Sequence, residues 1–114
     1  MVHIKRLQED GTDVLAIVGE IDASSSIDLD LAIAKSLSEG YTKILIDCNA
    51  LEYISSAGLG VFMSYIEEFK EKGYQMVIYG LKDKVANTFN ILGLDELLTI
   101  VPSKEDAKKK LGEV

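Results

Sequence analysis

The chain has 114 residues but only one cysteine, one histidine and one proline. A single cysteine, Cys48, excludes a disulfide within the chain. With His3 as the only histidine, a zinc site of the usual ligand count cannot be assembled from sulfur and imidazole ligands. Pro102 lies outside every strand and helix interior predicted below, so no proline interrupts them. We expect no metal and no cofactor.

Long apolar runs and clusters of positive charge are also missing. No run approaches the roughly 18 residues of a membrane-spanning helix, and the first residues do not resemble a signal peptide. We therefore expect a cytoplasmic protein without membrane contact. Acidic residues outnumber basic ones 19 to 12, for a net charge of −7, which argues against direct nucleic-acid binding. This length predicts one domain, residues 1–114, and we expect a monomer.

Strands and helices alternate along the chain. Two short strand patterns, His3–Leu7 and Val14–Val18, flank a turn at Glu9–Thr12 and predict an antiparallel hairpin. The later strands are predicted at 43–47, 75–79 and 97–101, and the helices at about 24–38, 56–72, 82–92 and from Ser103 to just before Gly112. The order β-β-α-β-α-β-α-β-α predicts an α/β fold with a mixed, mostly parallel sheet and an antiparallel edge strand.

Helical spacing predicts which side chains face the core. In the first helix the expected stripe is Ile27, Leu31, Ala34 and Leu37. Leu29 and Ile33 lie off that stripe, either as the edge of the core, which we favour, or as a binding surface. The helix after residue 55 has Leu59, Phe62, Met63, Ile66 and Phe69 on one face, and the helix after residue 81 has Val85, Phe89 and Leu92.

The most informative segment is LEYISSAGLG, residues 51–60. It puts Ser55 and Ser56 where a buried strand ends and a helix begins. Backbone N–H groups lack partners at a helix start, and the helix dipole favours negative charge there. A serine at this point is either a helix cap or a place where an added phosphate could be accommodated or could repel a partner.

Polar residues should gather near these serines, because loops that follow parallel strands meet at one edge of the sheet. The expected set is Glu20, Asp22, Asp47, Asn49, Ser55, Ser56, Lys82 and Asp83. No His or Cys base is predicted beside the serines, and a G-x-S-x-G elbow is absent, which argues against a serine hydrolase that uses Ser56. Asp22 and Asp47 could bind Mg²⁺ in principle, but no third carboxylate or phosphate supports such a site. We predict a binding protein without catalytic residues.

The segment YISSAGLGVF, together with GEIDASSS upstream and ILIDCNALEYI before it, resembles the STAS domain of bacterial anti-sigma factor antagonists. The resemblance spans nearly the whole chain. It puts Asp22 at the characteristic acidic position and Asp47 in the strand that precedes the phosphorylation site. It also implies a phosphoacceptor at Ser56, with Ser55 as second choice. Where the family often has Asp before the acceptor, this chain has Ser55.

The resemblance implies a mechanism and partners. The unphosphorylated protein would bind an anti-sigma factor that is also a serine kinase, which frees a sigma factor for transcription. Phosphorylation of the motif serine would end binding, and a separate phosphatase would reset the cycle. The residues expected to contact the partner are Asp22, Asp47, Ser55, Ser56, Gly58 and Leu59. The alternative is a STAS scaffold that binds other signalling proteins or a small ligand independently of phosphorylation.

Overall fold

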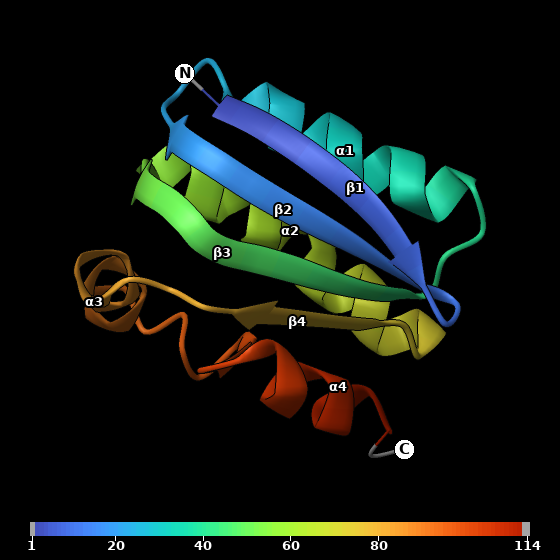
Figure 1. Cartoon of the computed structure of the whole chain (residues 1–114). Coiled ribbons are helices and arrows are strands. Elements are labelled where there is room, and N and C mark those ends of the chain that lie inside the picture. The colour runs from blue at the N-terminus through green and yellow to red at the C-terminus, as the bar shows by residue number, and fades with distance from the viewer. Residues whose placement is uncertain (1, 113–114) are drawn as a thin grey trace.

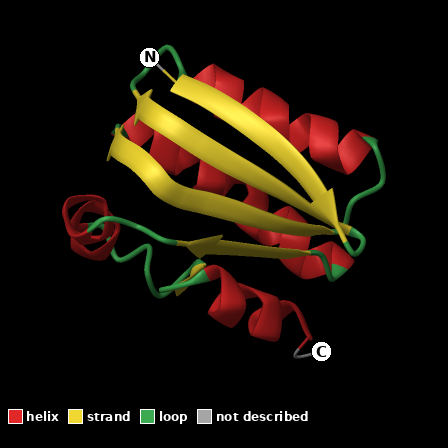
Figure 2. Ribbon diagram, viewed as in Figure 1, coloured by secondary structure: helices red, strands yellow, loops and turns green. Residues whose placement is uncertain are grey.

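The computed structural model describes residues 2–112 and contains one five-stranded mixed sheet with helices on both faces (Figures 1 and 2). The elements in chain order are β1 (Val2–Glu9), β2 (Thr12–Ile21), α1 (Ser26–Ser38), β3 (Lys43–Ile54), α2 (Ser56–Lys72), β4 (Gln75–Tyr79), α3 (Asp83–Ile91), β5 (Thr99–Val101) and α4 (Lys104–Gly112). This order confirms the predicted fold class.

The strands lie side by side in sequence order, β1-β2-β3-β4-β5. β1 is antiparallel to β2, and every other neighbouring pair is parallel. The predicted hairpin is confirmed, with Asp10 and Gly11 as its two turn residues at φ 51° and 77°. Positive φ at both positions is the geometry of the tight turns that match the twist of a hairpin.

Alternation of side chains along the strands builds two apolar layers, one on each face of the sheet. α1 and α2 cover the face that is turned away from the viewer in Figure 1, and α4 lies on the near face over β4 and β5. The larger core includes Leu15, Ile17, Ile44, Ile46, Leu59, Phe62 and Phe89. The smaller one, under α4, comprises Val14, Leu45, Val77, Tyr79, Ala107 and Leu111.

The predicted core stripe of α1 is wrong except at Leu37, which is partly buried against the larger core. Ile27 and Leu31 are each 62% exposed, whereas Leu29 and Ile33, which the prediction put at the edge, are fully buried. Both stripes of this helix carry aliphatic side chains, so their spacing alone could not decide which one faces the sheet. The same error affects the end of α3, where Leu92 is 54% exposed.

The bounds of α2 agree with the prediction, and Gly73 ends the helix in the left-handed region at φ 70°. β3 is much longer than predicted, because it runs on through Ile54 instead of ending at Asp47. Its pairing with β2 shifts register between Ala16 and Val18 and again between Gly19 and Glu20. These irregularities hide the strand from a simple alternation pattern. A single residue, Ser55, separates the end of β3 from the first residue of α2.

Candidate functional site

β2 and β3 end together, and this places the loop after β2 beside the start of α2. Ile21, the last residue of β2, pairs with Ile54, the last residue of β3. The backbone N–H of Ser55 donates to the carbonyl oxygen of Ile21 at 2.8 Å. Asp22 and Ser55 therefore follow directly from two hydrogen-bonded strand ends. The structure thus brings the predicted site residue Asp22 close to the predicted serines Ser55 and Ser56.

The two serines have different environments. Ser55 is the N-cap of α2, and its side-chain oxygen accepts the backbone N–H of Gly58 at 3.2 Å. Ser56 is the first residue of the helix, and its side chain is exposed. A single N-cap side chain satisfies one of the unpaired N–H groups at a helix start. Because Ser55 caps the helix, Ser56 is not needed as a cap. Because its side chain is exposed, Ser56 is accessible to a partner.

The glycine motif that follows has one buried and one open glycine. A Cβ built on Gly58 would lie 2.7 Å from Cγ1 of Ile54, whereas a Cβ on Gly60 would meet nothing within 4 Å. Leu59 between them is 1% exposed and belongs to the core. Gly58 and Leu59 thus hold the start of α2 against the sheet, and in this fold Gly60 is the motif residue that faces solvent.

Asp22 organises the loop that lies beside the serines. Its Oδ1 accepts hydrogen bonds from the Ser25 backbone N–H at 2.8 Å and from the hydroxyl groups of Ser24 and Ser25, each at 2.9 Å. Donation by the Ser25 backbone N–H, and then by the two hydroxyl groups, lowers the pKa of Asp22 from 3.8 to about 2. The carboxylate is therefore charged at neutral pH and fixed in position beside α2.

Asp47 lies elsewhere. It is seven residues before the end of β3, which corresponds to roughly 20 Å of extended strand, and it pairs with Tyr79 at the end of the shorter β4. Its Oδ1 accepts from the backbone and side-chain nitrogens of Asn49, at 3.0 and 2.9 Å. Burial, followed by the charge of Asp47, raises the pKa of Tyr79. The structure therefore does not bring Asp47 together with the serines. β3 continues well beyond the end of β4, so the carboxyl ends of these two parallel strands lie at different levels of the sheet.

Exposed apolar side chains near the serines form part of the site that the sequence did not predict. Met63, expected in the core, is 47% exposed. It shares one face of α2 with Ser56 and Gly60, at spacings of seven and three residues. α3 packs beside this helix through Phe89, whose ring centroid lies 6.2 Å from that of Phe62.

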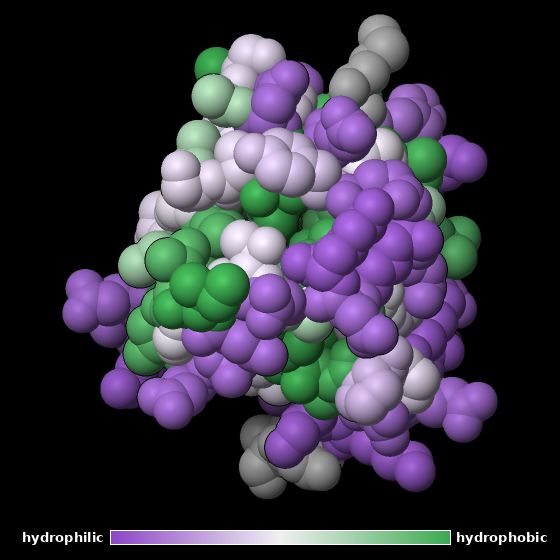
Figure 3. Space-filling model, turned by 90° about the vertical axis from the view of Figure 1, so that its left-hand side faces the viewer, coloured by the Kyte–Doolittle hydropathy of each residue, from purple (hydrophilic) through white to green (hydrophobic). Residues whose placement is uncertain are grey.

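The outer side of α3 adds exposed apolar and charged side chains to the same end of the molecule. Ile91 is 74% exposed. At the start of α3, Lys82 and Lys84 both pair with Glu52 of β3, each at 3.2 Å. Figure 3 views the end of the molecule at which β2 and β3 finish and shows an apolar area beside a strongly hydrophilic one. A partner that docks here would meet apolar, charged and hydroxyl groups together.

Two further findings concern residues 2–112 only. Within this range, no helix is both long enough and apolar enough to cross a lipid bilayer. In the same range, no three or more His, Cys, Asp and Glu side chains are grouped so that they could hold a metal ion.

The buried Cys48 thiol has a raised pKa, first through its burial and then through the charge of Asp47.

Comparisons with known proteins find similarity over nearly the whole chain. A family model described as the STAS domain matches residues 3–107. An anti-sigma-B factor antagonist from Listeria monocytogenes is 30% identical over 100 residues, which cover 87% of this chain and 86% of that protein. The crystal structure of an anti-sigma factor antagonist from Mycobacterium paratuberculosis superposes with a TM-score of 0.90 at 22% identity, and covers 99% of this chain and 96% of that one.

A further structural match is SpoIIAA, an anti-sigma factor antagonist solved in its unphosphorylated form. It superposes with a TM-score of 0.72 at 15% identity, and the match covers 100% of both chains. At this identity the match concerns the fold. All three proteins are described as anti-sigma factor antagonists.

Proposed function

Because this chain belongs to the STAS domain family, we propose that it is an anti-sigma factor antagonist whose binding surface is switched at Ser56. The unphosphorylated protein binds an anti-sigma factor and thereby frees a sigma factor. The anti-sigma factor is also a serine kinase, and it phosphorylates Ser56 and so ends the complex. A phosphoserine phosphatase restores the binding form. The protein itself is a substrate and a binding partner, not an enzyme.

The observation that carries this proposal is that the two serines have different roles: Ser55 caps α2, and Ser56 is exposed. Ser55 caps α2 through its contact with Gly58, which leaves the exposed Ser56 hydroxyl accessible to a kinase. A phosphate adds about −1.5 to −2 charges at neutral pH. At the first turn of a helix such a charge is favourable for the fold. Phosphorylation is therefore expected to change the surface and leave the fold intact.

The surroundings of Ser56 explain why added charge would release a partner. Asp22 is ionised in the neighbouring loop, and Met63 is exposed on the same face of α2. A phosphate would add to the negative charge of this surface and would have to be desolvated against any apolar group that contacts Met63. We include Asp22, Ser55 and Ser56 in the partner-binding site.

The other predicted contact residues have different roles in this proposal. Gly58 and Leu59 support the start of α2 from inside, and Asp47 contributes only if the partner extends along β3. We propose that the protein is a monomer before it meets its partner. A regulator of a sigma factor acts where transcription takes place, so we place it in the cytoplasm.

Binding measurements with the purified cognate anti-sigma factor test this function. We expect Ser56→Ala to bind like the unmodified protein and Ser56→Asp to bind about 5- to 150-fold more weakly, because coupling energies of roughly 1–3 kcal/mol are typical of such switches. Ser64→Asp is the matched control, since it adds the same charge at an exposed position two turns further along α2. Equal binding by all these variants would favour the phosphorylation-independent scaffold.

A further inference from the structure

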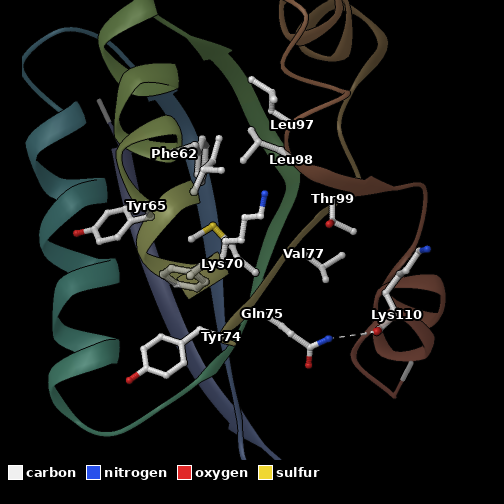
Figure 4. Close-up of a pocket in the computed structure, with 13 residues that line it drawn as sticks. Phe62, Tyr65, Lys70, Tyr74, Gln75, Val77, Leu97, Leu98, Thr99 and Lys110 are labelled. Atoms are coloured by element: carbon white, nitrogen blue, oxygen red, sulfur yellow. Dashed lines mark hydrogen bonds between the residues drawn. The ribbon is translucent and has the colours of Figure 1, made fainter. Parts of the chain in front are cut away.

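A groove runs along α2 on the side of β4 and β5, away from the hairpin. It has a volume of about 460 Å³ and lies between α2, β4 and the segment that leads into β5 (Figure 4). Such a volume falls within the range of small-molecule sites in proteins, roughly 300–1,000 Å³. One wall is closed by the Gln75 side chain, whose Nε2 donates to the carbonyl oxygen of Lys110 at 3.5 Å.

The walls of the groove are mainly aromatic and aliphatic. Phe62 and Ile66 come from α2, Met76 comes from β4, and Leu98 comes from the segment before β5. Leu97 next to it is 59% exposed, so apolar surface continues to the rim. An apolar molecule of moderate size would exclude water from this surface, at a gain that scales with the apolar area removed from water.

The charge of the lining is opposite to that of the protein. The whole chain has 19 acidic and 12 basic residues. Among the described residues that line the groove there is no Asp or Glu, whereas Lys70 and Lys110 are both present. In Figure 4 the Lys70 side chain extends from α2 toward Leu98 and Thr99, while the nitrogen of Lys110 points away from the groove. Lys70 therefore supplies the positive charge over an apolar floor.

We propose that this groove binds a small organic anion with an aromatic or aliphatic body. The body lies against Ile66, Met76 and Leu98, which are partly exposed, and the acidic group lies beside the Lys70 ammonium. Thr99 supplies a hydroxyl group at the rim. A neutral analogue gains only the apolar contacts, and a cationic analogue is repelled by Lys70. This site is separate from the surface around Ser56 and does not depend on its role.

Three probes with the same ring system test the charge preference: 2-naphthylacetate, 2-(2-naphthyl)ethanol and 2-(2-naphthyl)ethylamine. Each is titrated into the full chain labelled with ¹⁵N, and the amide signals are followed by NMR. We expect saturable shifts at residues 66–70, 76–77 and 97–99. The acid should bind about two- to fivefold more tightly than the alcohol, which is the range of an exposed ion pair, and the amine should bind most weakly.

Three variants locate the site. Lys70→Gln should remove the preference for the acid without weakening the alcohol. Lys109→Gln, at an exposed position of α4 outside the groove, should leave the preference unchanged. Thr99→Phe should fill the groove and weaken all three probes. The proposal is overturned if the shifts do not saturate or lie elsewhere, if the amine binds as tightly as the acid, or if Lys70→Gln and Lys109→Gln behave alike.

Discussion

A methyl group on Gly58 would lie 2.7 Å from Cγ1 of Ile54, closer than carbon atoms pack in proteins. Gly58→Ala should therefore force the start of α2 away from the ends of β2 and β3 and destabilise the protein by about 1–3 kcal/mol. Gly60→Ala should instead stabilise the protein by up to about 1 kcal/mol, since the site is open and alanine favours a helix. Urea denaturation of both variants checks this. Equal effects at the two glycines would contradict the packing described here.

The two serines should differ in their contribution to stability. Ser55→Ala removes the side-chain oxygen that accepts the Gly58 N–H and should cost about 0.5–2 kcal/mol of unfolding free energy. Ser56→Ala removes an exposed hydroxyl group and should stay within about 0.5 kcal/mol of the unmodified protein. Thermal or chemical denaturation measures both. A larger loss at Ser56 than at Ser55 would mean that the cap is assigned to the wrong residue.

A buried ion pair joins the two strands of the hairpin, and the same arginine links the hairpin to the end of α1. The Asp13 side chain is fully buried, and its Oδ2 accepts from Nη2 of Arg6 at 2.6 Å, while Arg6 also reaches Glu39 at 2.9 Å. Arg6→Met should leave the buried Asp13 carboxylate without a cation, although the Gln8 side chain still donates to its Oδ1 at 2.9 Å, and should cost about 3 kcal/mol. The control is Lys72→Met, which breaks an exposed pair with Glu68 and should cost about 0.5 kcal/mol or less. Denaturation midpoints compare the two, and similar losses would refute the special role of Asp13.

The Asp22 loop should be sensitive to acid. The pKa of Asp22 is lowered from 3.8 to about 2 in the folded protein. The contribution of this carboxylate to stability is therefore complete above pH 3.8 and is lost as the pH falls toward 2. Asp22→Asn should flatten the pH dependence of stability in this window. NMR titration of the carboxyl group measures its pKa directly, and a value near 4 would contradict the hydrogen-bonded geometry.

The sequence predicted α2 well because its ends are set by local chemistry: a serine cap at one end and a glycine in the left-handed region at the other. The parallel order of the strands also followed from local patterns. β3 could not be predicted to its full length, since its irregular register against β2 disturbs the alternation of its side chains. The burial of Leu29 in place of Leu31 depends on how α1 is rotated against the sheet, which only tertiary packing decides.

The candidate site was predicted in part for the same reasons. Ser55 and Asp22 directly follow two paired strand ends, as expected, since β2 and β3 end at the same level. Asp47 does not join them, because its position depends on the unequal lengths of β3 and β4. The exposure of Met63 could not be read from helical spacing, since a methionine beside Phe62 fits the edge of a core stripe as well as a surface.

The most direct test of the regulatory switch is to locate the phosphate. The protein is incubated with its cognate anti-sigma factor kinase and ATP, and the modified residue is identified by fragment mass spectrometry. We predict phosphate on Ser56, and the same chain with Ser56→Ala should remain unmodified while Ser55 is still present. Phosphate on Ser55, or on neither serine, would contradict the account.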